Sequence, residues 1–272
     1  MKLYFSGLGG AQKFIIDVVL ALPVHRALVS FYYPQQLDKL LKQSKDWSFF
    51  VDSGAYSAYN SGVTIDIDDY IAFIKEISSF VEISASLDVL GDPEQSMKNY
   101  LYMMDAGVDV WPTYHFGEPT SFLDSYVEIT NSICVGGVAG TGITPKSIQE
   151  NLKLIYSRYP YLKIHVFGVN SFSSMLGLPI YSVDALTWRS GSRFGDAFIS
   201  GRRYKVGRIA PRTPVFWEAA KYLKEKAGFD VTVEDMNWNH LDIYNIGELY
   251  RMLEVEHDEI VRASTVSSQY LF

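Results

Sequence analysis

Short runs of apolar residues alternate along this chain with longer segments in which apolar residues recur at helical spacing. Each run covers about five to eight residues and is rich in β-branched and aromatic side chains, as expected of strands buried on both faces. The pattern predicts eight strands, which cover residues 2–6, 27–32, 48–52, 82–88, 109–114, 133–138, 163–169 and 180–185.

The segments between these strands have the apolar spacing of amphipathic helices. Thr144 precedes Pro145 at the start of one of them, an arrangement favoured in the first turn of a helix. Helices are predicted over residues 11–22, 34–44, 66–80, 92–107 and 144–159, and again over residues 213–229 and from residue 245 onward.

The repeated alternation favours an α/β fold of the (β/α)₈ type, the TIM barrel, in which a parallel sheet closes on itself. An open, doubly wound sheet is the alternative interpretation of the same pattern. No linker rich in Pro, Gly or Ser divides the sequence, so residues 1–272 are predicted to form a single barrel domain. Residues 213–272 contain no clear strand and are predicted to form a helical C-terminal extension packed on the barrel.

Polar residues and glycines gather at the ends of the predicted strands. In a (β/α)₈ enzyme the reacting side chains come from the C-terminal ends of several strands. Three carboxylates are therefore expected to converge on one mouth of the barrel. The residues at the strand ends are Asp52, Ser53, Asp88, Tyr114, His115, Gly136, Gly137, Gly168, Asn170 and Asp184.

Each carboxylate also has a simpler explanation, because an Asp at a strand end often caps the helix that follows. Asp184 precedes no predicted helix, and a charge between Val183 and Ala185 requires a partner or a function. The three carboxylates together favour a catalytic site over capping alone. The pair Gly136 and Gly137 is compatible with a tight turn, and equally with backbone N–H groups that approach a flat ligand.

Two carboxylates on either side of a sugar form the arrangement that cleaves glycosidic bonds, in which one attacks the anomeric carbon and the other transfers a proton. Metal-assisted hydrolysis is the rival chemistry. The five histidines lie far apart in the sequence and form no HxH pair, so no metal site and no cofactor are predicted. His165 falls in the middle of a strand and is expected to belong to the barrel wall.

The composition excludes several classes of protein. With 48% hydrophobic and 20% charged residues, the chain has the composition of a folded protein and not of a disordered or fibrous one. Cys134 is the single cysteine, which excludes an internal disulfide and a cysteine-rich zinc site. The apolar stretch 14–22 contains Asp17 and is too short to cross a bilayer, and the first ten residues lack the apolar core of a signal peptide. We therefore expect a soluble cytoplasmic protein, in the host cytoplasm if the source is viral, with no membrane partner.

The net charge of −7 conceals one strongly basic segment. Residues 189–212 carry a net charge of +6, which leaves −13 for the rest of the chain. Such a run can be no more than a solvated face, but its contrast with an acidic protein favours a contact with phosphates. Aromatic residues Trp188, Phe194 and Tyr204 lie among the charges, as expected where bases stack. The basic residues are Arg189, Arg193, Arg202, Arg203, Lys205, Arg208 and Arg212.

Five sequence blocks occur in order at the ends of predicted strands: DSGAY, SLD, CVGGVAG, HVFGVN and YSVDAL. Their order and spacing over roughly residues 48–190 resemble those of the tRNA-guanine transglycosylase superfamily. In that family the blocks are DSGGF or DSGGY, an Asp-containing strand end, GGLA, a Met-Gly-Val block, and an Asp followed closely by a PTR motif.

The resemblance implies a base-exchange reaction that needs no cofactor. Asp184 resembles the nucleophile that attacks the sugar C1′ and displaces guanine, and Asp52 resembles the general acid/base that takes a proton from the incoming 7-deazaguanine. Asp88 is similar to the carboxylate that binds the amino and ring N–H edge of the base, and Gly136 and Gly137 match the backbone donors to its carbonyl. The predicted substrate-binding residues are Ser53, Tyr56, Asp88, Tyr114, His115, Gly136, Gly137, Phe167 and Gly168.

The chain also departs from the family. It cannot form the zinc site of three Cys and one His that the bacterial tRNA-acting members carry after the barrel. The glutamine expected after strand five is replaced by Tyr114 and His115, Ala55 replaces the second glycine of the first block, and LTWRSG replaces the PTR motif. The compact form without zinc resembles the branch, found in phages and bacterial gene clusters, that inserts 7-deazaguanine derivatives into DNA.

The sequence therefore predicts a guanine transglycosylase that acts on DNA, with a 7-deazaguanine base as its second substrate. A homodimer is compatible with the resemblance, because relatives commonly pair. The alternatives are the same chemistry on tRNA, a non-catalytic nucleic-acid-binding barrel, and a glycosidase for small nucleosides. The basic segment argues against the last, since a small neutral substrate has no phosphates for it to bind.

Overall fold

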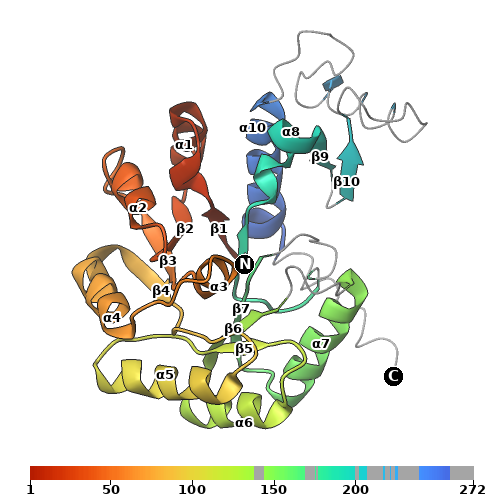
Figure 1. The fold of residues 1–272 in the computed structure, drawn as a ribbon. Coiled ribbons are helices and arrows are strands. Elements are labelled where there is room, and N and C mark those ends of the chain that lie inside the picture. The colour runs from red at the N-terminus through yellow and green to blue at the C-terminus, as the bar shows by residue number, and fades with distance from the viewer. Residues whose placement is uncertain are drawn as a thin grey trace, which may run out of the picture.

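Eight parallel strands form one curled sheet that alternates with helices, so the fold is α/β and TIM-barrel-like (Figure 1). The computed structural model describes residues 1–137, 144–168, 175, 177–199, 202–206, 217, 221, 224–225 and 239–257. The strand order in the sheet is β4-β3-β2-β1-β8-β7-β6-β5. The strands are β1 (Lys2–Ser6), β2 (Arg26–Ser30), β3 (Ser48–Asp52), β4 (Val81–Ser84), β5 (Thr113–His115), β6 (Ser132–Gly136), β7 (Lys163–Val166) and β8 (Ser182–Ala185).

The two outermost strands of this order, β4 and β5, approach each other. A parallel bridge pairs Ala85 with Trp111. Its hydrogen bonds run from the N–H of Ser86 to the carbonyl of Trp111 (2.9 Å) and from the N–H of Trp111 to the carbonyl of Ser84 (2.8 Å). The curl of the sheet therefore brings the ends of all eight strands around one axis.

Two hydrophobic clusters follow from the alternation of side chains along the strands. On β1, Leu3 and Phe5 point outward into the core between the sheet and the helices. Tyr4, between them, points inward and packs with Phe50 and Cys134 in the interior of the sheet. Asp184 is buried on β8 between outward-facing Val183 and Ala185, so it shares the inner face.

Helices cover the outer face of the sheet. Several begin where the sequence provides a capping side chain: Asp66 accepts from the N–H groups of Asp68 and Asp69, and Thr144 accepts from the N–H of Ser147. The helices are α1 (Lys13–Leu20), α2 (Pro34–Leu41), α3 (Ala55–Asn60), α4 (Ile67–Glu76), α5 (Pro93–Asp105), α6 (Thr120–Ile129) and α7 (Pro145–Arg158), with short 3₁₀ turns at Leu8–Gly10 and Ser78–Phe80.

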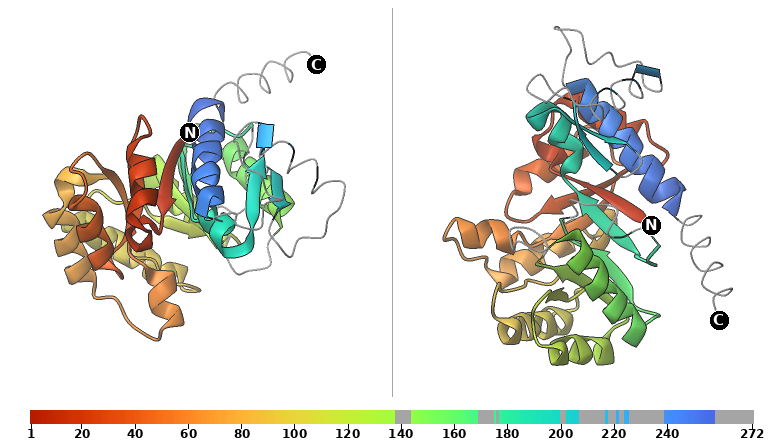
Figure 2. Two further views of the ribbon diagram at one scale, coloured as in Figure 1. Left: turned by 90° about the horizontal axis from the view of Figure 1, so that it is seen from above. Right: turned by 90° about the vertical axis from the view of Figure 1, so that its right-hand side faces the viewer.

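After β8 the chain forms a 3₁₀ turn η4 (Thr187–Arg189), a short helix α8 (Ser190–Phe194) and an antiparallel hairpin of β9 (Asp196–Ile199) and β10 (Arg202–Lys205). Helix α10 (Asn239–Tyr250), continued by a π-helical turn (Arg251–Val255), packs against α1, α8 and β9. Figure 2 shows α10 running along the side of the sheet near β1. In a (β/α)₈ barrel each strand is followed by a helix on the outside of the sheet, and α10 occupies the position of the helix that would follow β8.

Side-chain bonds fix α10 in this position. Asn245 accepts from the N–H of Phe198 (3.0 Å) and donates to the carbonyl of Asp196 (3.1 Å). In the π-helical turn, a carboxylate oxygen of Glu254 accepts from the N–H of Leu3 and from the guanidinium of Arg26 (2.8 Å). The C-terminal segment therefore closes over the N-terminal ends of β1 and β2.

The predicted strands and helices agree with the structure to within a few residues, apart from the extra elements α3, α6, α8 and the hairpin. The hairpin escapes prediction because β10 reads Arg-Arg-Tyr-Lys and has no apolar run. The helix predicted from residue 245 is observed, although it begins at Asn239. The helix predicted over 213–229 lies almost entirely outside the described residues. Among the described helices, none has the length and apolar character required to cross a membrane.

Candidate active site

A pocket of about 540 Å³ opens at the C-terminal ends of the strands. Of the residues predicted from the sequence, Asp52, Tyr56, Asp88, His115, Gly136, Gly137, Phe167, Gly168 and Asp184 line it. Ser53 and Tyr114 are buried but do not line it, and Asn170 lies outside the described residues. The described lining residues that the sequence did not single out are Ser6, Leu28, Gly54, Ala55, Ser57, Leu90, Thr113 and Leu186.

Asp52 stands at the end of β3, where the backbone turns sharply. The N–H of Gly54 donates to its carboxylate (3.0 Å). Gly54 has φ +81°, and a Cβ there would lie 2.4 Å from Oγ of Ser30, so the turn requires glycine. Burial, together with the negative charges of Asp88 and Asp184, raises the pKa of Asp52 to about 7. Asp52 is therefore suited to exchange a proton near neutral pH.

Asp184 projects from β8 and is held by neutral donors. Oγ of Ser6 donates to one oxygen, and the N–H of Gly168 donates to the other (2.7 Å). Gly168 lies just after the end of β7 and adopts φ +64°. In this backbone conformation its N–H points toward the carboxylate of Asp184. The Asp184 side chain remains slightly exposed to the pocket. This carboxylate is thus fixed in orientation by a hydroxyl and a backbone amide, with no Lys or Arg paired to it among the described residues, as suits a nucleophile.

His165 lies beneath Asp184 on β7 and is fully buried. Its ring stacks on Phe50 with centroids 4.0 Å apart, and Nδ1 lies 2.9 Å from Oγ of Ser182. Nε2 lies 3.6 Å from Oδ1 of Asp184 and has no hydrogen-bond partner. Burial lowers the pKa of His165 despite the nearby carboxylate, which favours the neutral ring. His165 is therefore a wall residue, as predicted, but one that faces the carboxylate of Asp184.

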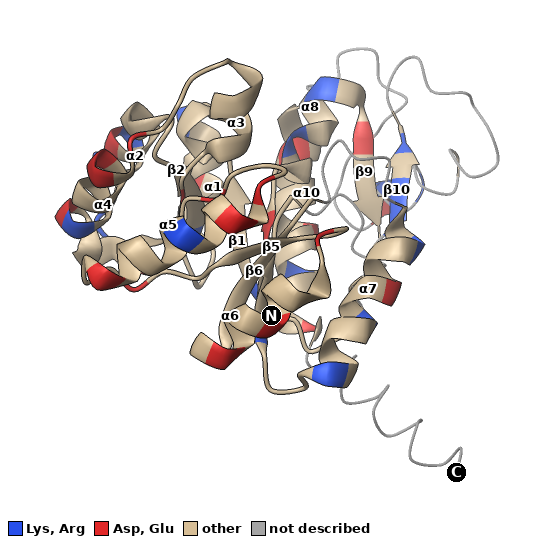
Figure 3. Ribbon diagram, turned by 60° about the horizontal axis from the view of Figure 1, so that its bottom comes forward, with Lys and Arg blue, Asp and Glu red and all other residues tan. Residues whose placement is uncertain are grey.

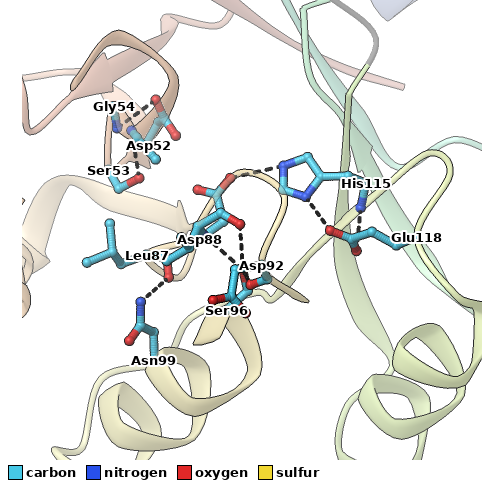
Figure 4. A network of polar contacts seen from close by, with 12 residues as sticks. Asp52, Ser53, Gly54, Leu87, Asp88, Asp92, Ser96, Asn99, His115 and Glu118 are labelled. Atoms are coloured by element: carbon cyan, nitrogen blue, oxygen red, sulfur yellow. Dashed lines mark hydrogen bonds and ion pairs between the residues drawn. The ribbon is translucent and has the colours of Figure 1, made fainter. Parts of the chain in front are cut away.

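On the other side of the pocket, the side chains of Asp88 and His115 face each other and are in contact. Nε2 of His115 lies 3.0 Å from Oδ2 of Asp88, and Nδ1 lies 3.0 Å from Oε1 of Glu118 (Figure 4). Burial alone would lower the pKa of His115, but the two carboxylates overcome it and raise the pKa to about 9. His115 is accordingly an imidazolium at neutral pH.

The remaining walls are glycine and aromatic residues. A Cβ on Gly136 would lie 2.8 Å from Cδ2 of His115, so the ring packs directly on the β6 backbone. Gly137 continues this strand end with φ +79°. Phe167 makes edge contacts with Phe50 and His165, and Tyr56 at the start of α3 is 54% exposed. The aromatic residues Tyr56 and Phe167 therefore both line the pocket, together with the polar side chains described above.

Within the described part of the chain, no group of three or more His, Cys, Asp or Glu side chains is arranged to hold a metal ion. Asp52 at the end of β3, Asp88 in the loop after β4 and Asp184 on β8 line the pocket without forming a ligand cluster among the described residues.

The basic segment begins directly after Leu186, which lines the pocket. Its described cations lie on η4, α8 and β10, and Figure 3 shows Lys and Arg on α8 and β10. Phe194 is half exposed and has Arg193, Arg203 and Lys205 within 6.0 Å of its ring centroid. Buried Asp196 pairs with Arg203 and Lys205, whereas Arg202 is exposed. Arg208 and Arg212 lie outside the described residues.

Sequence reasoning missed Ser6 and Glu118. Ser6 ends β1, so the strand-end rule that identified the other residues also applies to it. Glu118 lies three residues beyond His115 in a turn, and no sequence pattern marks it as a partner of that histidine.

No protein-family model matches this sequence, and neither does any of the curated proteins with which it was compared.

Proposed function

We propose that this protein is a guanine transglycosylase on a complete (β/α)₈ barrel, which replaces guanine in nucleic acid by a 7-deazaguanine derivative. The observation that carries the proposal is the presence of Asp52, Asp88 and Asp184 in one pocket, each in a different environment. Asp184 is held by neutral donors, Asp52 has a pKa near neutrality, and Asp88 is bound to a cation. These environments suit a nucleophile, an acid/base and a base-binding carboxylate, respectively.

In the first step, a carboxylate oxygen of Asp184 attacks C1′ of the target nucleotide. The bond between C1′ and N9 breaks, and its electron pair leaves with guanine, which takes a proton from Asp52. The product is an ester between Asp184 and the sugar. The N–H of Gly168 and the hydroxyl of Ser6 keep the attacking carboxylate in place.

In the second step, N9 of the incoming base gives its proton to Asp52 and attacks C1′. The ester bond breaks, and its electron pair returns to the carboxylate of Asp184. Asp52 is thereby protonated again for the next turnover. A pKa of about 7 lets one group act in both directions without a cofactor.

The base lies, in this proposal, between the rings of Tyr56 and Phe167. Asp88 accepts hydrogen bonds from the ring N–H and amino group of the base, and the backbone at Gly136 and Gly137 faces its carbonyl. All five residues line the pocket. A purine edge that presents two adjacent donors is the natural partner of a fixed carboxylate.

DNA is the proposed polymer. A target base must leave the stack before its C1′ can be reached, at a cost of a few kcal/mol. The cations around Phe194 are placed where the chain leaves the pocket and would hold the flanking phosphates. An exposed aromatic ring among cations also suits contact with unstacked bases.

Mass spectrometry of nucleosides tests the proposal and its choice of polymer. DNA and tRNA are purified separately from cells that express the protein and are supplied with a 7-deazaguanine base. A 7-deazaguanine deoxynucleoside in the DNA digest alone is the expected result. A modified nucleoside in tRNA alone would support the proposed reaction and show that its substrate is tRNA and not DNA. No change in either pool would contradict the proposal and favour a non-catalytic barrel.

A further inference from the structure

One wall of the pocket contains a row of three side chains in contact, Asp88, His115 and Glu118. The three side chains come from the loop after β4, the end of β5 and the turn before α6, and each is at most 12% exposed. Glu118 binds twice, because its second oxygen also accepts from the backbone N–H of His115 (3.1 Å). Figure 4 shows the imidazole between the two carboxylates.

This geometry determines which form of the imidazole fits. A carboxylate only accepts hydrogen bonds, and a neutral imidazole has a single N–H donor. Both 3.0 Å contacts can be hydrogen bonds only if the ring carries two protons and a positive charge. In a neutral ring, one nitrogen would carry a lone pair in place of a proton, and this lone pair would face a carboxylate oxygen.

Apart from Asp88 and Glu118, the described neighbour that packs directly on the His115 ring is Gly136 of β6, which carries no charge. No Lys or Arg is among the described residues that line the pocket, so His115 is the cation of this described wall. Across the pocket, Asp52 interacts electrostatically with Asp88. Glu118 does not line the pocket and lies behind His115.

We propose that His115 and Glu118 are positioning residues for Asp88, and that base binding depends on the charge that Glu118 maintains on His115. The charged ring holds Oδ2 of Asp88 and leaves Oδ1 for the N–H groups of the base. It also offsets the electrostatic repulsion between Asp88 and Asp52. This inference rests on the proposed base site, and it concerns affinity for the base rather than the covalent step.

The test compares Glu118→Gln with the wild-type protein in equilibrium dialysis against radiolabelled guanine at pH 6.5 and pH 8.5. Gln keeps the shape of Glu118 but removes its charge, so the pKa of His115 falls and its charge is lost as the pH rises. Asp52 titrates between these pH values in both proteins, so the readout is the ratio of the Glu118→Gln dissociation constant to that of wild type at each pH. This ratio should rise about fivefold or more from pH 6.5 to pH 8.5.

Two controls separate this effect from a structural one. Glu128→Gln makes the same change on an exposed position of α6 and should behave as wild type at both pH values. His115→Gln has no titrating ring, so its affinity should be weaker than that of wild type by about the same factor at both pH values. If Glu118→Gln weakens binding by the same factor at both pH values, or not at all, the inference is wrong.

The readout does not depend on turnover. A protein that binds guanine with the expected pH dependence but exchanges no base would refute the proposed reaction and keep this inference. A wild-type protein that exchanges bases, with a Glu118→Gln profile identical to its own, would refute the inference and keep the reaction. Absence of guanine binding by the wild-type protein would refute both.

Discussion

Asp52 and Asp184 are the same residue type in one pocket, and their neighbours give them different properties. The Gly54 amide favours the charged form of Asp52, but burial and two nearby carboxylates outweigh it. Asp184 receives a hydroxyl and a backbone amide on its two oxygens. Two carboxylates in different environments are what an acid/base and a nucleophile need.

The raised pKa of Asp52 predicts a specific dependence of stability on pH. The folded protein keeps the Asp52 proton up to about pH 7, whereas an unfolded chain loses it near pH 4. Stability therefore falls as the pH rises through this window. Asp52→Asn should be more stable than wild type at pH 8, on the order of 2 kcal/mol, and no more stable at pH 4. Urea denaturation at both pH values measures the difference, and equal gains at both would show that the titration is not responsible.

His165 provides a second prediction for single residues. His165→Phe keeps an aromatic ring against Phe50 and removes the Nε2 group that faces Asp184 at 3.6 Å. Exchange should slow by about tenfold with unchanged affinity for the base, because His165 does not line the pocket. Ser182→Ala, which removes only the partner of Nδ1, should have a smaller effect. A wild-type exchange rate for His165→Phe would show that the ring is only part of the core.

Among the elements, those with a buried face were the predictable ones. All eight sheet strands were predicted because their apolar side chains fill one or both faces of the sheet. The β9–β10 hairpin was not, because β9 has only four residues and β10 is polar. Helix α6 was also not predicted, although its apolar residues Phe122, Leu123, Tyr126 and Val127 have helical spacing. Tertiary packing against α10 fixes the hairpin, and a local sequence pattern cannot show that contact.

The same alternation explains where the site prediction was incomplete. Thr113 and His115 line the pocket, so Tyr114 between them must point to the other side of the strand. Its hydroxyl donates to the carbonyl of Glu118, away from the pocket. Strand parity would have excluded Tyr114 from the sequence alone. The contact between His115 and Glu118 depends on the shape of a turn and could not be predicted in that way.

The hairpin and α8 carry the prediction for nucleic-acid binding. Arg193 and Arg202 are exposed, so Arg193→Ala and Arg202→Ala should weaken binding to duplex DNA. Each should lower the slope of log affinity against log salt concentration by about one, as expected for a lost phosphate contact. Lys75→Ala on α4 is the matched control and should leave the slope unchanged. Fluorescence anisotropy at several salt concentrations measures the slopes, and unchanged slopes for both Arg variants would exclude this surface.

For the molecule as a whole, the C-terminal segment joins the end of the described chain to its first strand. Glu254 binds the N–H of Leu3 and the guanidinium of Arg26, and both sides of this ion pair are about 15% exposed. The bonds cover the end of the sheet opposite the pocket. The contact therefore joins the π-helical turn to β1 and β2, and β1 ends at Ser6 in the pocket.

Glu254→Ala should therefore destabilise the whole fold by about 2–3 kcal/mol, because it leaves the amide of Leu3 without its acceptor and leaves Arg26 with Glu82 alone of its two carboxylate partners. Base binding at 25 °C should be unchanged, since Glu254 is remote from the pocket. Glu256→Ala breaks a more exposed pair with Arg251 and should cost less than about 1 kcal/mol. Denaturant unfolding measures both variants, and equal losses would contradict a specific role for Glu254.

The most direct test of the central claim is exchange of radiolabelled guanine into duplex DNA by the purified protein, with Asp184→Asn beside it. This measurement does not require the natural 7-deazaguanine to be known. The wild-type protein should incorporate label into DNA, and Asp184→Asn should incorporate none while still binding guanine. Incorporation by Asp184→Asn at a rate close to wild type would contradict the assignment of Asp184 as the nucleophile.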